Sequence, residues 1–157
     1  MSPAQREHCS SAPGRGARIV IVESHPELAL LLDYYLSAQG YRLELIARGD
    51  VAERHLSGSL PDLVVLAWAS PGVSGIELLR RLRRTPAGQR LPILLLATGR
   101  GRADAEHAIA RGADDVATEP FTLGQIAGRI AALPREPAPC MAGSDARRDE
   151  VLPRSEE

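Results

Sequence analysis

Chemistry in this sequence would have to come from the residues at the carboxyl ends of its short apolar runs. These residues are Glu23-Ser24, Ala67-Trp68, Ala97-Thr98 and Thr118-Glu119-Pro120. If the runs are parallel strands of one open sheet, their carboxyl ends meet at the edge where functional groups gather in such sheets.

No arrangement of nucleophile, base and orienting group accompanies these carboxylates, so the sequence predicts no enzymatic activity. Histidines are scattered without the spacing of metal ligands, and we expect neither a metal site nor a cofactor. The basic run Arg80, Arg81, Arg83 and Arg84 is interpreted as solvated charge, favourably placed at the end of a helix, rather than as a nucleic-acid surface.

The elements that must position these residues alternate along the chain. Apolar runs predict five strands, at Arg18–Glu23, Tyr41–Ile46, Leu63–Trp68, Leu91–Ala97 and Asp115–Ala117. Five amphipathic segments predict helices at Pro26–Gln39, at Asp50–Leu56 with Asp50 as N-cap, after Ser74, at Ala103–Arg111 and after Thr122. Ser74 with Glu77, and Thr122 with Gln125, have the spacing of capping boxes. This alternation predicts an α/β fold, a doubly wound parallel sheet of five strands with five helices on its two faces.

In the first of these helices, Leu28, Leu31, Leu32, Tyr35 and Leu36 share one face, which we expect to be buried.

Composition bounds the domain and its partners. Residues 1–16 predict a disordered lead, residues 17–133 a folded domain, and residues 134–157 a disordered, proline-rich tail. The chain has 157 residues and a net charge of −1, which argues against duplex nucleic acid and anionic membranes as partners. Its two cysteines, Cys9 and Cys140, lie in the predicted tails and provide no disulfide framework, so we expect a cytoplasmic protein.

Four stretches of the sequence resemble a response-regulator receiver domain, closest to the OmpR/PhoB subfamily. They are Ile19–Pro26, Pro61–Trp68 leading into Pro71–Gly75, Leu91–Thr98 and Gly112–Phe121. The resemblance extends over residues 17–133 and implies the strand order 2-1-3-4-5 of flavodoxin-like and CheY-like sheets. It also implies transfer of a phosphoryl group from a histidine kinase to an aspartate after the third strand, with the help of Mg²⁺.

The residues that the resemblance assigns to this chemistry are largely absent. The family has an acidic pair, the acceptor aspartate, a serine or threonine, a lysine and a switch aromatic at the positions occupied here by Glu23-Ser24, Ala67, Ala97, Glu119 and Val116. One group of the phosphorylation site in five remains, and Glu119 reverses the charge of the lysine. The resemblance thus implies that Glu23 and Glu119 place two like charges at this site, which repels anions and could hold a cation. A solvated edge without a function is the simpler interpretation. Thr98 follows the expected hydroxyl by one residue and would point to the other face of an extended strand.

The sequence therefore predicts a pseudo-receiver, a phosphorylation-independent module that binds other signalling proteins in two-component-type signalling or transcriptional control. An alternative is a sensor of a small ligand or a cation that uses the remodelled pocket. Asp114, Asp115 and Arg129 match charged positions of the face by which family members pair and could form salt bridges across a two-fold axis. This face consists of the fourth helix, the fifth strand and the fifth helix.

Trp68 is either a partly exposed contact anchor or a lid packed over the pocket. Because only a short tail follows Leu133, we expect no DNA-binding domain and no direct nucleic-acid contact.

Overall fold

The computed structural model describes residues 16–97 and 102–133, and its centre is a parallel sheet of five strands. The strands are β1 (Arg18–Val22), β2 (Arg42–Ile46), β3 (Leu63–Ala67), β4 (Ile93–Ala97) and β5 (Asp115–Thr118). They lie in the order β2-β1-β3-β4-β5, so the predicted fold class and strand order are confirmed. All four pairings are parallel, as in the register of Ala67 with Leu96 and of Ala97 with Thr118.

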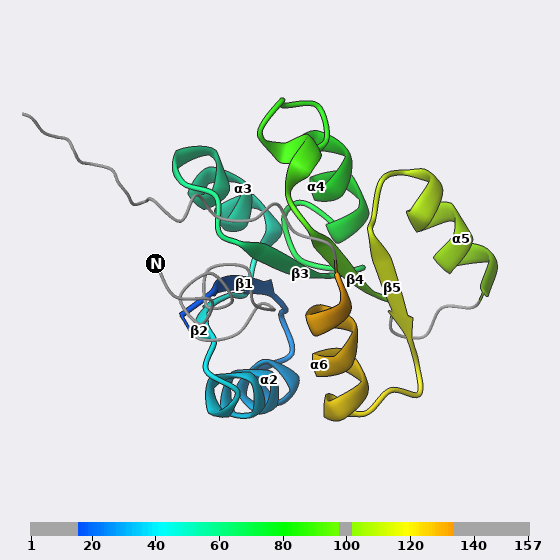
Figure 1. Cartoon of the computed structure of the whole chain (residues 1–157). Coiled ribbons are helices and arrows are strands. Elements are labelled where there is room, and N and C mark those ends of the chain that lie inside the picture. Colours follow the sequence, from blue (N-terminus) through cyan, green and yellow to red (C-terminus); the bar gives the residue numbers. More distant parts are fainter. Residues whose placement is uncertain (1–15, 98–101, 134–157) are drawn as a thin grey trace, which may run out of the picture. The chain divides into compact units, whose positions relative to one another are not determined.

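Helices cover both faces of the sheet (Figure 1). They are α2 (Pro26–Ala38), α3 (Gly49–Gly58), α4 (Gly75–Leu82), α5 (Arg102–Ala110) and α6 (Leu123–Ala132), with a short 3₁₀ turn, η1 (Gly88–Arg90), before β4. Helices α2 and α6 pack on one face, and α3, α4 and α5 on the other. This arrangement of helices on two faces explains why the strands read as nearly continuous apolar runs.

Alternate strand residues divide the core into two layers. Val20 and Val22 point into the layer under α3, α4 and α5, whereas Ile19 and Ile21 point into the layer under α2 and α6. All four side chains are almost completely buried. The two-residue period of a strand produces this division, and each layer receives its own set of helical leucines and isoleucines.

The helix termini follow the predicted caps in part. Thr122 and Gln125 form the complete capping box at the start of α6. Ser74 accepts the backbone N–H of Glu77 at 3.3 Å, but the Glu77 side chain pairs with arginines of α4 instead of returning to the cap. The prediction that Asp50 is an N-cap was wrong: α3 begins after Arg48, and the carboxylate of Asp50 binds the Arg48 guanidinium at 3.0 Å.

The basic run at the end of α4 was predicted to be solvated, and this was wrong for Arg83. Its guanidinium donates to the carbonyl oxygens of Gly112 at 2.9 Å, of Leu91 at 2.7 Å and of Gly88, and it pairs with Asp114 at 2.9 Å. The side chain is only 16% exposed. Arg83 thus ties the end of α4 to η1 and to the segment before β5.

The expectation that Leu31 is buried was also wrong. Leu32 and Leu36 are covered by the sheet, and Leu28 and Tyr35 are half-buried, but Leu31 is 52% exposed. The five apolar residues cover a wider arc of the helix than the sheet can contact, so one edge of the arc faces solvent.

Several predictions fall on residues outside the described ranges, namely Cys9, Cys140, Thr98 and the two predicted tails. Disorder of the tails stays a prediction. No helix within the described ranges is long and apolar enough to cross a membrane.

Candidate functional site

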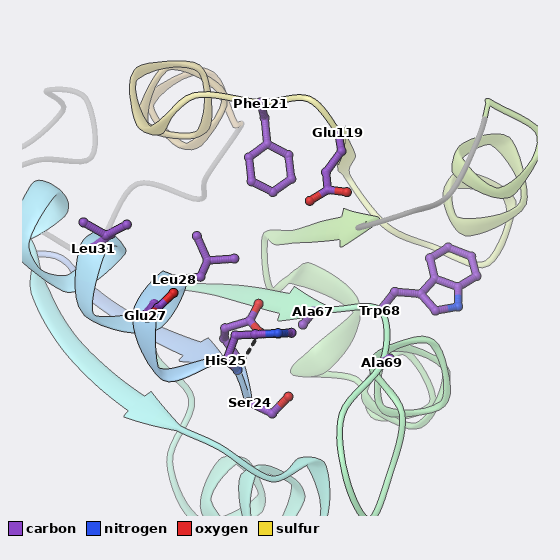
Figure 2. Close-up of a pocket in the computed structure, with 11 residues that line it drawn as sticks. Ser24, His25, Glu27, Leu28, Leu31, Ala67, Trp68, Ala69, Glu119 and Phe121 are labelled. Carbon is purple, nitrogen blue, oxygen red and sulfur yellow. Dashed lines mark hydrogen bonds and ion pairs between the residues drawn. The ribbon is translucent and has the colours of Figure 1, made fainter.

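A cleft of about 530 Å³ lies at the carboxyl ends of the strands (Figure 2). Residues that follow three strands line it: Glu23 and Ser24 after β1, Trp68 and Ala69 after β3, and Glu119 and Phe121 after β5, together with Ala67, the last residue of β3. The first turns of α2 and the residue before them complete the wall with His25, Glu27, Leu28 and Leu31. The predicted edge of the sheet is therefore hollowed where the sequence placed its candidate residues.

Glu23 is the buried polar residue of this cleft. Its side chain is 4% exposed, and Oε2 accepts the backbone N–H of His25 at 2.9 Å. The imidazole Nδ1 of His25 lies 3.7 Å from the same oxygen, but most of the histidine ring is in solvent. This hydrogen bond holds the Glu23 carboxylate at the turn that connects β1 to α2.

Ala67 presents only a methyl group at the end of β3. The residue is buried, and the backbone continues in register, since the N–H of Trp68 donates to Leu96 at 2.9 Å. The N–H of Gly75 then returns to the carbonyl oxygen of Trp68 at 2.8 Å, which closes the loop that leads into α4. The end of β3 is therefore fixed by backbone hydrogen bonds on both sides of Ala67, whose own side chain offers no nucleophile.

Trp68 is half-buried, and it both lines the cleft and packs against the core layer of α4. This partial burial is compatible with both predicted roles of Trp68, the exposed contact anchor and the lid over the pocket. Across the cleft, the side chains of Glu119 and Phe121 descend from the segment after β5 (Figure 2). Glu23 and Glu119 thus line the same cleft.

Ala97 and Val116 lie elsewhere. Both are buried in the core layer under α4 and α5, rather than lining the cleft. Val116 borders a separate hollow of about 260 Å³ that it shares with Ala105, Glu106, Ile109 and Asp115. Val116 occupies the position at which the resemblance implies a switch aromatic, and this hollow lies beside its smaller side chain.

The charged residues predicted at a pairing face have partners within the chain. The Asp115 carboxylate binds Arg129 of α6 through both oxygens at 2.8 Å. The Asp114 carboxylate accepts the backbone N–H of Ile93 at 2.8 Å and pairs with Arg83. Asp114 therefore positions the start of β5 beside β4, a role that the sequence did not predict.

Sequence reasoning missed the apolar wall of the cleft. Leu28 and Leu31 were assigned to the helix core, and Phe121 was used only as part of a motif. The available signal was the spacing of Leu28 and Leu31, three residues apart in the first turns of a helix that begins three residues after Glu23. Such a helix must bring its first turns next to the end of β1.

Comparison with known proteins agrees with this geometry. A profile of the response regulator receiver domain matches residues 19–131. The phosphate regulon transcriptional regulatory protein PhoB of Rhizobium meliloti (strain 1021) is 43% identical over 122 residues, which are 78% of this chain and 54% of that protein. The chain thus spans about half the length of the curated relatives it matches.

Two solved structures show the same fold. A putative response regulator from Chloroflexus aurantiacus superposes with a TM-score of 0.70 at 27% identity, over 74% of this chain and 95% of that one. The receiver domain of the sensor histidine kinase PA1611 from Pseudomonas aeruginosa, which holds a magnesium ion in its active site cleft, gives a TM-score of 0.67 at 26% identity, over 73% of this chain and 94% of that one. The chain belongs to the response regulator receiver domain family, and its receiver is of the OmpR/PhoB type.

Proposed function

We propose that this receiver works without phosphoryl transfer, as a protein–protein interaction module in two-component-type signalling or transcriptional regulation. The observation that carries the proposal is Ala67 at the end of β3, where a methyl group occupies the acceptor position inside the cleft. An alkyl side chain has no lone pair with which to attack phosphorus. Neither Ser24 nor His25 stands at the end of β3, where the resemblance places the acceptor.

The residues of the cleft do not fit the magnesium ion that the family uses. Mg²⁺ needs octahedral coordination by hard oxygen ligands and is usually held by one or two carboxylates together with the substrate. Of the expected carboxylates only Glu23 remains, and its Oε2 already accepts the backbone N–H of His25. Ser24 and Ala67 stand where the other two would be, so we assign no step of the protein's function to this ion.

Charge at the cleft also opposes an incoming phosphoryl group. Glu119 lines the wall opposite Ala67, at the position where the family has a lysine. A transferring phosphoryl group carries negative charge that must be neutralised, and a carboxylate raises rather than lowers that cost. Because the described residues of the cleft include no combination of nucleophile, base and orienting group, we propose a binding role and no catalytic one.

The loss of both switch groups has a consequence for the face made by α5, β5 and α6. Ala97 has no hydroxyl to follow a phosphoryl group, and Val116 has no ring to move. A face that no event gates rests in one conformational state and is permanently available to a partner. We propose other signalling proteins, or a second copy of this chain, as that partner.

A dimer through this face would depend on apolar contacts. Ile109 is 46% exposed there, whereas Asp115 and Arg129 already bind each other within the chain. An exposed ion pair contributes only about 0.2–1 kcal/mol, so exchanging it for an intermolecular pair adds little affinity. Sedimentation velocity tests the homodimer, which Ile109→Glu should dissociate. A monomer at high micromolar concentration would leave only a different protein as the partner.

The loss of phosphorylation is tested by intact mass after incubation with acetyl phosphate and Mg²⁺. We expect no added phosphoryl group on the natural chain. Ala67→Asp alone should react poorly, because Ser24 and Glu119 remain, whereas the triple variant Ser24→Asp, Ala67→Asp, Glu119→Lys should react readily. A stable phosphoryl group on the natural chain would refute the proposal.

A second candidate function is that of a small-ligand sensor at the remodelled cleft. Burial of the Glu23 carboxylate in a hollow with apolar walls favours it. A true ligand raises the unfolding temperature, whereas a pure interaction module gains stability only from its protein partner.

A further inference from the structure

The described residues give the Glu23 carboxylate fewer hydrogen bonds than a buried carboxylate can accept. A carboxylate can accept about four hydrogen bonds, but here Oε2 accepts the His25 N–H and lies 3.7 Å from the His25 ring. Within the described part of the chain, no further donor reaches either oxygen. A buried anionic group in this state is costly unless a cation or further donors complete its surroundings. The cleft in front of it is the place from which such a group can arrive.

The charge of the cleft selects the sign of that group. Glu27 lines it together with Glu23, and no lysine or arginine is among the described residues of its lining. Anions are repelled from such a site, and cations are concentrated in it.

The walls select its chemical class. Leu28, Leu31, Trp68 and Phe121 present apolar and aromatic surface, and Figure 2 shows the Phe121 ring pointing into the cleft. The volume of about 530 Å³ is that of a small-molecule site. A metal ion would leave these walls in water, and no group of three or more metal-ligating side chains occurs among the described residues. An aromatic face, in contrast, attracts an organic ammonium group, and an alkyl wall covers its hydrocarbon part.

We propose that the cleft binds a small organic amine, whose ammonium group pairs with Glu23 and whose apolar body packs on Leu28, Leu31 and Phe121. The carboxylate that would bind the ammonium group and the leucines that would cover the apolar body lie next to each other, at the carboxyl end of β1 and in the first turns of α2. The inference does not depend on the interaction role proposed above, but it rests on the second candidate function, because it names the ligand class of that same cleft. Phosphotransfer and sedimentation measurements can fail without affecting it.

Titration with 2-phenylethylamine tests this proposal, with the fluorescence of Trp68 as readout. Trp68 is the single tryptophan of the chain and lines the cleft, so its signal reports on this site. We expect a saturable change. The neutral alcohol 2-phenylethanol, which has nearly the same shape, should bind more weakly by about ten-fold or more, because it lacks the charge.

Glu23→Gln should weaken the amine by a similar factor and leave the alcohol unchanged, because glutamine keeps an oxygen for the His25 N–H. Glu106→Gln, which changes the net charge equally on α5 away from the cleft, is the matched control and should bind as the natural chain does. If Glu23→Gln does not fold, as judged by circular dichroism, the comparison of amine with alcohol on the natural chain still decides.

Equal affinity for amine and alcohol would overturn the proposal, as would a lack of saturation up to about 10 mM amine. Displacement of the amine by micromolar Mg²⁺ would show a metal site instead. Tighter binding of Nα-acetyl-lysinamide than of 2-phenylethylamine would refute a free small amine as the ligand, in favour of a lysine side chain from a partner protein.

Discussion

Replacing Arg83 with methionine would test whether one side chain ties the second half of the domain together. The guanidinium reaches three backbone carbonyl oxygens, at Gly88, Leu91 and Gly112, and the carboxylate of Asp114. Methionine retains most of the apolar stem, so the substitution removes the hydrogen bonds while the packing of the stem is largely kept.

The expected loss follows from the number and surroundings of these bonds. Each hydrogen bond contributes about 1 kcal/mol net, and a donor with a charge contributes somewhat more. The contact with Asp114 is partly solvated and adds no more than about 1 kcal/mol. Because the Arg83 side chain is 16% exposed, water replaces the lost donors only in part. The free energy of unfolding should fall by about 3–4 kcal/mol, which lowers the melting temperature by about 10–15 °C in a domain of this size.

Urea unfolding followed by Trp68 fluorescence and circular dichroism measures this change. Arg84→Met is the matched control, because Arg84 is the next residue, is exposed, and should change stability by no more than about 0.5 kcal/mol. Equal effects of the two substitutions, or a loss below about 1 kcal/mol for Arg83→Met, would show that these bonds contribute no net stability.

Three further substitutions test other contacts. Gly75→Ala should lower the free energy of unfolding by about 2–3 kcal/mol in urea, because its methyl group would lie 1.9 Å from the carbonyl oxygen of Ala67. Gly128→Ala should raise it by about 0.5–1 kcal/mol in the same assay, because the new methyl group would have nothing within 4 Å apart from its chain neighbours and the backbone of its own helix, and alanine favours the helix. A hydrogen bond from His55 lowers the pKa of Glu44, with Arg18 contributing. Glu44→Gln should therefore destabilise by at most about 1 kcal/mol at pH 7, since the side chain is largely solvated. The difference from the natural chain is present above the ordinary glutamate pKa and should disappear as pH falls through the lowered pKa, which urea unfolding at pH 7 and pH 3 would show. A constant difference across this range would refute the role of its charge.

The architecture could be predicted from the sequence because both faces of the sheet are covered. Strands such as Leu63–Ala67 are buried at every residue, so they stand out as continuous apolar runs between amphipathic segments. Turn residues added the boundaries: Gly40 follows α2 with a φ of +100°, a conformation that glycine adopts without strain. The positions of the strands and helices could therefore be predicted from the local sequence.

Contacts between distant segments could not be predicted. Nothing near Asp114 indicates that its carboxylate meets Arg83, which precedes it by 31 residues. For the same reason Leu31 was assigned to the core, since periodicity defines a helical face but not how much of it the sheet covers. The cleft was therefore predicted only in part. Its residues at the strand ends were predicted from the sequence, whereas its apolar wall depends on how α2 packs against the sheet.

The strand order also restricts how copies of this domain can meet. Strands β2 and β5 are the two edges of the sheet, and an edge strand can act as a template on which another chain adds a strand. β5 has only four residues, and β2 alternates Arg42 and Glu44 with its apolar residues, a pattern of charge that discourages runaway edge-to-edge aggregation. The charge on β2 and the short length of β5 therefore favour contacts through the helices and loops of the domain over pairing of its sheet edges.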